Sequence, residues 1–459
     1  MPIRLFPLIF LLIFSTSSSA IDSTEARHLI LRTGFSPTPA ELASVLPLGY
    51  RQAVDRLLFR GTGRAQTALP SWIDELPPAP RIRKAMSKDE RKALRKKMRK
   101  RGLELRGWWL KEMVATPSPL MERMVLFWHN HFTSSLQKVR WPNLIYRQNR
   151  LLRRHALGNF RELLHAVTRD PAMVIYLDSS RNRKGKPNEN FARELLELFT
   201  LGEGHYTEKD IKEAARAFTG WSVNRRNGDF RFRPRWHDAG NKTFMGRSGH
   251  FDGDHIIKIL LEQPQTAELI VKKLWREFIS PTPDLKQVKQ FAALFRRNNY
   301  ELKPLLRAML LSRTFRDPTN RNTLIKSPVE YLVGTLRLLN IPLQGGQGLA
   351  FVSRRLGQDL LNPPNVKGWP GGNNWITSET LPLRRQMMQR LLRGMGSRGK
   401  GGMRKMRLGE PDDAPFRQLE SQAMIDLVLG RPPVDGVDRS LGQQRLLRRL
   451  LLDPVYHLK

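Results

Sequence analysis

The sequence contains no cysteine among its 459 residues. This absence excludes a disulfide-stapled fold, a thiol nucleophile, and zinc or iron–sulfur sites built on thiolate ligands. Acidic residues are scarce beside basic ones, with 42 Asp and Glu against 79 Lys and Arg, and the formal net charge is +37. Hydrophobic residues still make up 40% of the chain, which is enough for a packed core. Any functional site must therefore use His, Asp, Glu, Asn and Arg.

Long hydrophobic runs are also missing, apart from one at the N-terminus. A short basic start ending at Arg4 is followed by an apolar run from Leu5 to Phe14 and a small-residue stretch that ends at Ala20. These are the parts of a secretory signal peptide, so residues 1–20 are predicted to be removed after Ala20. The run is too short to span a membrane, although an uncleaved N-terminal anchor is the alternative. We expect an exported protein, periplasmic or secreted, without a later transmembrane span.

The rest of the chain is predicted to be mainly α, a multi-helix globular body. Apolar residues recur with helical spacing over many segments, including one long helix expected over 39–58. Ser or Thr followed by Pro marks helix starts at Thr38, Ser118 and Ser327, and Thr207 is expected to form a capping box. One region differs, because Asn-Gly separates two alternating segments there and predicts a small β-hairpin insert near 221–233.

Charge and glycine content predict the domain organisation. The helical body is expected over 21–392, and it includes an exposed basic segment, 81–106, with 13 Lys or Arg against 3 Asp or Glu. Residues 393–414 are expected to form a flexible basic linker, because they are rich in Gly, Lys and Arg. Residues 415–459 would then form a C-terminal helical piece.

Two histidines close a strongly apolar helix that begins after Ser118. In an extended segment His129 and His131 would face the same side and could share a metal ion, whereas in a helix they would point about 200° apart. The alternative is a pair of buried histidines, each hydrogen-bonded in the core.

A second group lies in the string from Arg183 to Gly202, where a basic Gly/Pro loop leads into a helix. A helical wheel places Glu189, Asn190, Arg193, Glu194 and Glu197 on one face. A solvated face with ion pairs one turn apart explains this pattern without any function. Glu194 and Glu197 together match a glycosidase pair poorly, because such carboxylates flank the bond from different sides.

Two further segments gather polar and aromatic residues. Three His and three Asp, from His237 and Asp238 to His255, could suit a divalent metal, although Asp252 is equally well placed to cap a helix. A Pro/Gly-rich loop over 361–375 carries Lys367 and two tryptophans. Trp369 could stack on a sugar ring, or could simply cover a helix end.

Together these strings resemble the bacterial domain of unknown function 1800 family. The matching strings include Trp128–Phe132, the central string 183–202, Ala217–Trp221, His237-Asp238 and the loop 363–372. The resemblance implies an exported, mostly helical protein and supplies no activity, cofactor or catalytic residue. It also implies a shared pathway with secreted sulfatase-like proteins, which suggests a sulfatase-like exported partner.

Two functions remain open. The first is a polar pocket for an anionic or carbohydrate-like ligand, with hydrolysis as one possible activity and with cofactor and metal unknown. Its catalytic candidates are His129, His131, Glu194, His237 and Asp238, and its ligand-binding candidates are Arg183, Lys186, Asn188, Glu189, Asn190, Arg193, Trp221, Lys367 and Trp369. The second is a non-enzymatic basic binding or scaffold protein for an acidic envelope polymer or partner protein. Nucleic acid is a poor candidate, because the chain carries an export signal and no recognition motif.

Overall fold

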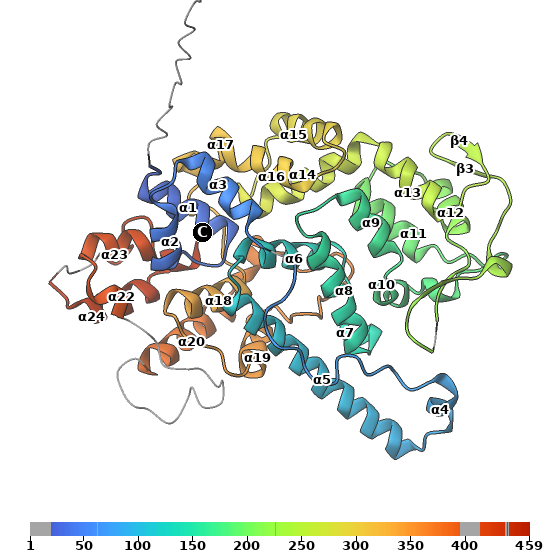
Figure 1. Cartoon of the computed structure of the whole chain (residues 1–459), viewed down its shortest axis with the longest axis horizontal. Coiled ribbons are helices and arrows are strands. Elements are labelled where there is room, and N and C mark those ends of the chain that lie inside the picture. Colours follow the sequence, from blue (N-terminus) through green and yellow to red (C-terminus); the bar gives the residue numbers. More distant parts are fainter. Residues whose placement is uncertain (1–19, 62, 225, 395–413, 437, 439) are drawn as a thin grey trace, which may run out of the picture.

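A computed structural model of the chain describes residues 20–61, 63–224, 226–394, 414–436, 438 and 440–459. The predicted signal peptide, up to residue 19, and most of the predicted linker 393–414 lie outside these ranges. The protein is mainly α, as predicted, and its helices surround one extended hydrophobic core (Figure 1). None of the helices in the described ranges is long and apolar enough to cross a membrane.

The first third of the chain forms part of the body and an arm that leaves it. Its helices are α1 (Ser23–Thr33), α2 (Pro39–Val45), α3 (Tyr50–Phe59), α4 (Pro80–Ala85) and α5 (Lys88–Ala115). The single helix predicted over 39–58 is wrong, because the chain breaks after Val45 and restarts at Tyr50. Pro47 has no N–H to continue the helix, and Gly49 caps α3. The N-terminal half of α5 projects from the body with α4 at its end, so most of the basic segment 81–106 is an exposed helix (Figure 1).

The middle of the chain carries the strings that the sequence singled out. Its helices are α6 (Pro119–His131), α7 (Leu136–Val139), α8 (Pro142–His155), α9 (Phe160–Thr168), α10 (Pro171–Tyr176), η1 (Ser179–Arg181), α11 (Asn190–Glu194), the π-helical turn η2 (Leu195–Thr200) and α12 (Glu208–Ala217). Thr207 forms the predicted capping box with Asp210 at the start of α12. The Ser118 side chain, in contrast, makes no capping hydrogen bond to α6.

Two short antiparallel hairpins follow α12. Strands β1 (Trp221–Val223) and β2 (Phe230–Phe232) form the predicted insert, with Ser222 opposite Arg231. After the single turn η3 (Pro234–Trp236), β3 (Lys242–Phe244) pairs with β4 (Arg247–Gly249). This second hairpin was not predicted, because its turn, Met245-Gly246, lacks the Asn-Gly signal that marked the first one.

Helices also make up the rest of the chain, and the C-terminal ones are bonded to α1. They are α13 (Gly253–Glu262), α14 (Pro264–Phe278), α15 (Leu285–Arg297), α16 (Leu302–Leu311), α17 (Arg313–Arg316), η4 (Pro318–Asn320), α18 (Pro328–Leu338), α19 (Gln347–Arg355), η5 (Gly372–Trp375), α20 (Thr380–Gly394), α22 (Ala414–Arg417), α23 (Ser421–Val428), α24 (Gln443–Leu452) and η6 (Pro454–His457). The Arg27 guanidinium of α1 donates to the backbone oxygens of Leu427 and Val428 at 3.0 and 3.1 Å, which ties the C-terminal helices to α1.

Four charged side chains, all buried except the partly exposed Glu277, join distant parts of the chain at the centre of the body. Arg123 of α6 pairs with Glu277 of α14 and with Glu330 of α18, and Lys459 pairs with Glu330 as well. Burial alone would raise the pKa of Glu330, but the positive charges of Arg123 and Lys459 outweigh it and lower that pKa to about 2. Glu330 therefore stays ionised in the core.

Replacing Glu330 by Gln should destabilise the protein by about 3–5 kcal/mol, because it leaves two buried cations short of a counter-charge. Since the folded-state pKa of Glu330 lies below its ordinary value of 4.5, its stabilising contribution is present above about pH 4.5 and is lost as the pH falls toward 2. Denaturant unfolding between pH 7 and pH 2 would measure both effects.

Glu262→Gln is the control. It breaks the exposed pair with Arg247 and should change the unfolding free energy by no more than about 1 kcal/mol. Equal losses in the two variants at pH 7 would contradict this role for Glu330.

Candidate functional site

The end of α6 and the Pro/Gly-rich loop fit closely together. The backbone N–H of Trp369 donates to the Asn130 Oδ1 at 2.7 Å. Gly368, with φ +84°, lies so close that a Cβ there would be 2.2 Å from the same oxygen. Only glycine satisfies both the left-handed backbone and this approach. The loop is therefore held at a fixed position against α6.

This loop brings Lys367 to the carboxylates of η2 and the turn after it. The Lys367 Nζ lies 3.9 Å from the Glu197 Oε1 and 3.4 Å from the Glu203 Oε1. The Tyr206 hydroxyl donates to the Glu197 Oε2 at 2.9 Å. Glu197 is thus bound by a phenol on one oxygen and faces an ammonium group with the other.

Glu194 lies one turn before Glu197 and is half-buried. Burial raises the pKa of its carboxyl, the negative charge of Glu197 raises it further, and Lys367 and Arg193 only partly oppose them. Within the described ranges the Glu194 carboxyl has no hydrogen bond and no ion pair. It is a carboxyl that keeps its proton to a higher pH than an ordinary glutamic acid and is not used by the fold.

A second group of polar side chains adjoins Glu194 through Tyr176. The charge of Glu194 contributes to the raised pKa of the Tyr176 hydroxyl, after the larger effect of burial. The Lys138 Nζ lies 5.5 Å from the centre of the Tyr176 ring and 2.7 Å from the Asp178 Oδ2. The Asn188 side chain donates to the backbone oxygen of Asp178 at 3.3 Å. We call the whole set the motif cluster, and it consists of Lys138, Tyr176, Asp178, Glu194, Glu197, Tyr206 and Lys367.

The π-helical turn η2 sits under this cluster. In it the Thr200 hydroxyl donates to the Leu195 backbone oxygen, five residues earlier, at 2.6 Å. The Leu198 carbonyl, in the last turn where helix carbonyls lack intrahelical partners, accepts a hydrogen bond from the Lys273 Nζ at 2.9 Å. π turns are rare and occur often at functional sites.

His129 and His131 are buried in the core behind the cluster. Burial lowers the pKa of His129 to about 4, and burial together with the Lys273 charge lowers the pKa of His131. The Lys273 Nζ lies 2.9 Å from the His131 Nδ1, which makes that nitrogen the acceptor of a neutral ring. His129 packs edge-on against Trp109 and also touches Trp369. Both side chains occupy α6, so they point apart as expected for a helix.

His237, Asp238 and Trp221 lie on the hairpin side of α12. The Asp238 carboxylate accepts from Arg216 at 2.8 Å, and the His237 Nδ1 lies 3.0 Å from the Thr219 oxygen. Trp221 is buried edge-on between Phe218 and Phe230. These contacts anchor the hairpins.

The possible metal ligands of this region are spread out. Asp252 caps α13, which is the alternative that the sequence left open for it. Within the described ranges, no group of three His, Asp or Glu side chains could hold a metal ion.

The remaining candidates surround the loop before α11. Arg183 and Lys186 are exposed and face each other across a bridge in that loop. Arg193 forms a two-pronged pair with Glu208 at 2.7 and 2.9 Å and a weaker one with Glu189 at 3.4 Å. Asn190 starts α11, and its N–H donates to the Asn188 Oδ1 at 3.0 Å.

Sequence reasoning missed several residues that organise the site. Asn182 is fully buried, accepts from the Asn188 N–H at 2.9 Å and donates to the Ala215 oxygen at 3.0 Å, so it shapes the loop. Lys138, Tyr176 and Tyr206 were missed as well. They lie in separate segments, and no spacing in the sequence signals that these segments meet.

Residues 28–453 match the model of a family described as "Protein of unknown function (DUF1800)". The chain belongs to this family. The match confirms the resemblance based on the motif strings. No curated protein and no solved structure matches the chain. For this member of DUF1800, the chemistry of the site must therefore be argued from its own residues.

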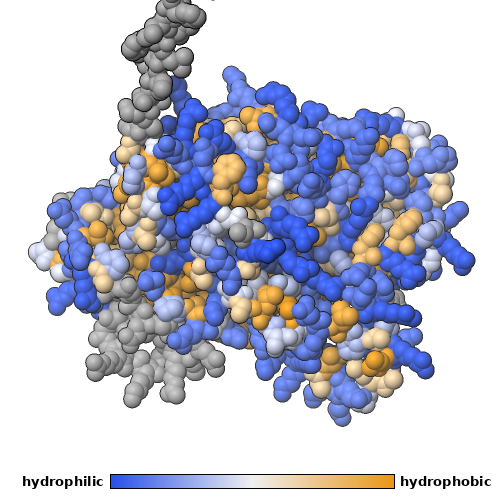
Figure 2. Space-filling model, in the orientation of Figure 1, coloured by the Kyte–Doolittle hydropathy of each residue, from blue (hydrophilic) through white to orange (hydrophobic). Residues whose placement is uncertain are grey.

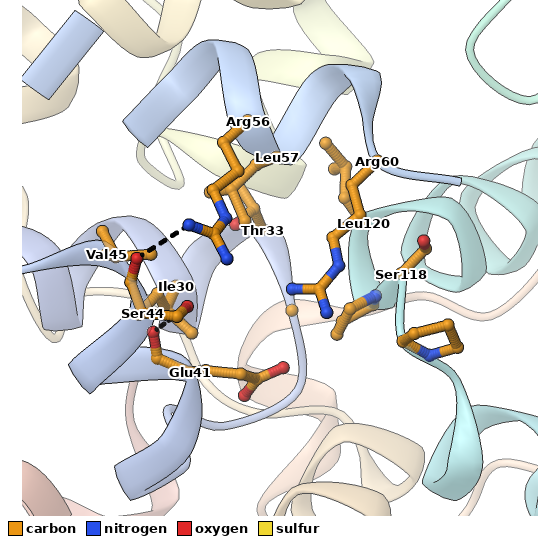
Figure 3. Close-up of a pocket in the computed structure, with 13 residues that line it drawn as sticks. Ile30, Thr33, Glu41, Ser44, Val45, Arg56, Leu57, Arg60, Ser118 and Leu120 are labelled. Carbon is orange, nitrogen blue, oxygen red and sulfur yellow. Dashed lines mark hydrogen bonds between the residues drawn. The ribbon is translucent and has the colours of Figure 1, made fainter. Parts of the chain in front are cut away.

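A small cavity elsewhere in this DUF1800 protein can be set aside. It lies between α1, α2, α3 and the start of α6, where Arg56 donates to the Ser44 oxygen at 3.0 Å (Figure 3). Its volume is about 20 Å³. A buried water needs at least about 10–15 Å³, so the space suits one water molecule and no larger ligand.

Replacing Gly368 by Ala should push the loop away from Asn130 and separate Lys367 from Glu197. We expect a loss of about 2–4 kcal/mol in unfolding free energy, from the clash and the left-handed backbone together. Gly371→Ala is the matched control, because its φ is +70° but nothing lies within 4 Å of the added Cβ. It should cost only about 1–2 kcal/mol. Thermal or urea unfolding of both variants would check this, and equal losses would contradict a close contact at Gly368.

Proposed function

We propose that the protein is exported and that its motif cluster binds a carbohydrate-like ligand, which it hydrolyses with Glu194 as the proton donor. The observation that carries this proposal is the Glu194 carboxyl, which has a raised pKa, no partner in the described fold, and a half-exposed position among lysines and tyrosines. A carboxyl that supports the fold has a partner, as Glu330 has in Arg123 and Lys459.

The residue types around Glu194 suit a ligand with many hydroxyl groups. Carboxylates accept hydrogen bonds from sugar hydroxyls, and the ammonium groups of Lys138 and Lys367 donate them. General acid catalysis requires a carboxyl that is still protonated near the working pH, which burial of Glu194 favours. In the proposed step, Glu194 gives its proton to the leaving oxygen as the bond to the sugar carbon breaks.

The second carboxylate of this reaction must come from another element. Glu197 lies on the same side of the same helix as Glu194, which is unsuitable. Asp178, just after α10, belongs to a different segment, and its Oδ2 lies 2.7 Å from the Lys138 Nζ. We propose that Asp178 takes the proton of the attacking water, whose oxygen bonds to the sugar carbon. Arg183 and Lys186, exposed beside it, would hold an anionic substituent of the ligand.

Export is part of the same proposal. Residues 1–20 would be removed after Ala20, which is exposed, and the first buried residue of the described fold comes directly after it. Ile21 is buried, and its N–H donates to the Leu48 oxygen at 2.8 Å. Asp22 then caps α1. In the periplasm or outside the cell, the ligand would be an envelope or extracellular glycan.

Glu194→Gln should abolish hydrolysis while the fold is retained. We expect at least about a 100-fold loss of rate, because a general acid contributes about 10²–10⁴-fold. Above pH 4.5 the unfolding free energy of the Gln variant should equal or slightly exceed that of the original protein. A carboxyl whose pKa is raised by folding lowers the unfolding free energy once the pH exceeds its ordinary value, and the variant lacks this carboxyl. Release of reducing ends from a panel of glycans, together with urea unfolding, would measure both.

Two further measurements sharpen this test. Glu197→Gln should lower the pKa of Glu194, because the substitution removes a neighbouring negative charge. NMR titration of labelled Glu would measure this change. Glu203→Gln is the control for hydrolysis, since the exposed Glu203 contacts only Lys367 among the cluster residues. An ordinary pKa at Glu194, or full activity in the Gln variant, would overturn the proposed role.

The exposed face of α5 favours a second candidate, a non-enzymatic basic protein that binds an acidic envelope polymer or an acidic exported partner, such as a sulfatase-like protein. Arg95, Lys96 and Arg99 are exposed on the arm, and this part of the helix has few acidic residues to offset them. Hydrophilic side chains dominate the face in view, and hydrophobic ones are scattered over it in small groups (Figure 2). Such a surface attracts polyanions over a long range.

Changing Arg95, Lys96 and Arg99 together to Ala should weaken binding to a sulfated polysaccharide at least about tenfold at low salt, with little difference left at 0.5 M salt, because salt screens exposed charges. Binding would be measured by calorimetry against heparin as the probe. Glu194→Gln serves as the comparison and should leave this binding unchanged. Retention of full affinity by the triple variant would exclude α5 as the polymer-binding surface.

A further inference from the structure

A separate cavity of about 430 Å³ lies between the loop after α3 and the last turns of α8. Its volume falls within the range of about 300–1,000 Å³ that is typical of small-molecule sites. The lining residues are Gly63, Arg64, Ala65, Leu69, Tyr146, Arg150, Arg153 and Arg154. None of them belongs to the motif cluster. Four arginines in one small cavity require an explanation of their own.

The helix α8 supplies most of the lining from one of its faces. Tyr146, Arg150, Arg153 and Arg154 follow one another at spacings of four, three and one residues, which places them on a single side of the helix. Basic residues are favourable in the last turn of a helix, and this explains Arg153 and Arg154. It does not explain Arg150, which lies a turn earlier, or Arg64, which comes from a different segment.

Three of the four arginines carry charge that the fold does not neutralise. Arg153 is buried, and Glu122 accepts from it at 2.7 and 2.9 Å. Arg64, Arg150 and Arg154 are exposed, and within the described ranges none has a hydrogen bond or an ion pair. The acidic residue that acts on Tyr146 beside the cavity is the exposed Asp74. The cavity thus keeps a net positive charge.

Tyr146 is the polar group on the inner wall. Its side chain is only 8% exposed, and its ring packs edge-on against Trp108 with centres 5.5 Å apart. The hydroxyl has no hydrogen-bond partner among the described residues. Burial raises the pKa of this phenol, although Arg150 and Arg153 oppose the change, so it remains a hydrogen-bond donor at neutral pH.

The loop that carries Arg64 is held in place. The Glu112 carboxylate accepts from the backbone N–H of Gln66 and of Thr67, at 3.0 and 2.7 Å. The Trp108 Nε1 donates to the Thr67 oxygen at 3.2 Å. Gly63, with φ +67°, passes close to the end of α8, where an added Cβ would be 3.7 Å from the Arg153 oxygen. Arg64 is therefore placed next to the α8 arginines before any ligand arrives.

We infer that this cavity binds the phosphate or sulfate group of a sugar-sized ester. Guanidinium groups match the oxygens of such oxyanions in pairs, and three unneutralised arginines suit a group with more than one negative oxygen. The cavity volume leaves room for the organic part, which would rest against Leu69, Ala65 and the Tyr146 ring. A free phosphate or sulfate ion would use the same arginines as the sugar ester, so the binding of each must be measured separately.

The test measures binding of glucose 6-phosphate, glucose 6-sulfate, inorganic phosphate, inorganic sulfate and glucose to the full mature chain by calorimetry. We expect the esters to bind at least tenfold more tightly than glucose. Arg150→Ala with Arg154→Ala should weaken ester binding at least tenfold, and Tyr146→Phe should weaken it several-fold without any change in charge. Equal binding of inorganic phosphate and the phosphate ester would support the oxyanion site and identify a free anion as sufficient.

A matched variant controls for non-specific attraction. Arg445 and Arg449 of α24 are also exposed arginines four residues apart, so changing both to Ala removes the same charge at the same spacing. This variant should bind the esters within twofold of the original protein. The inference is overturned if no ester or inorganic anion binds at millimolar concentration, or if the two double variants lose affinity equally. Glu194→Gln should retain ester binding, which makes this result independent of the proposed hydrolysis.

Discussion

The arrangement of the whole body depends on a set of paired charges, three of which are buried. Arg123 lies between Glu277 and Glu330, and Lys459 faces Glu330 from the C-terminal end of the chain. Removing ions from water costs several kcal/mol each, and only close pairing offsets that cost. Each of the four groups is therefore stable at its position only when its partners are also in place. This requirement fixes α6 relative to α14, α18 and the C-terminal residues, and α6 in turn carries Asn130, against which the Pro/Gly loop is seated.

A second buried pair extends the same frame to the other side. Glu122 accepts from Arg153 of α8 and from the Trp109 indole of α5, at 2.7 and 3.0 Å. α5, α6 and α8 are thus joined at one carboxylate. The consequence for function is that two proposed sites share α6 as their support. The motif cluster lies beyond its C-terminal end, and the arginine cavity lies beside the α8 residues that Glu122 holds.

Local rules of sequence predicted the local features well. Asn227-Gly228 indicated the first hairpin, the Thr207 and Ser327 caps form as expected, and the apolar run of α6 is buried. Each of these depends on a few neighbouring residues. The break near Pro47 was missed, because the periodicity continues across it and outweighed one proline.

The candidate site was only half predictable, for a related reason. The strings around Glu194 and Lys367 were recognised, but their meeting depends on a contact between residues more than 150 positions apart. The tyrosines and Lys138 carry no sequence signal of their own. Conversely, His237 and Asp238 appeared close in sequence to other possible ligands, yet Arg216 and Thr219 engage them on the hairpin side of α12. Division of the chain into a body, a linker and a C-terminal piece stays a prediction.

The π-helical turn at Leu195–Thr200 has a consequence for how this chain can vary. A π turn accommodates more residues per turn than an α turn. Loss of a single residue within the turn would let the helix continue as a regular α-helix, with every side chain after the deletion rotated by about 100°. Glu197 would then leave Lys367 and Tyr206, and Phe199, which packs against His131 and Phe132, would turn out of the core. The segment should therefore tolerate changes of side chain more readily than changes of length.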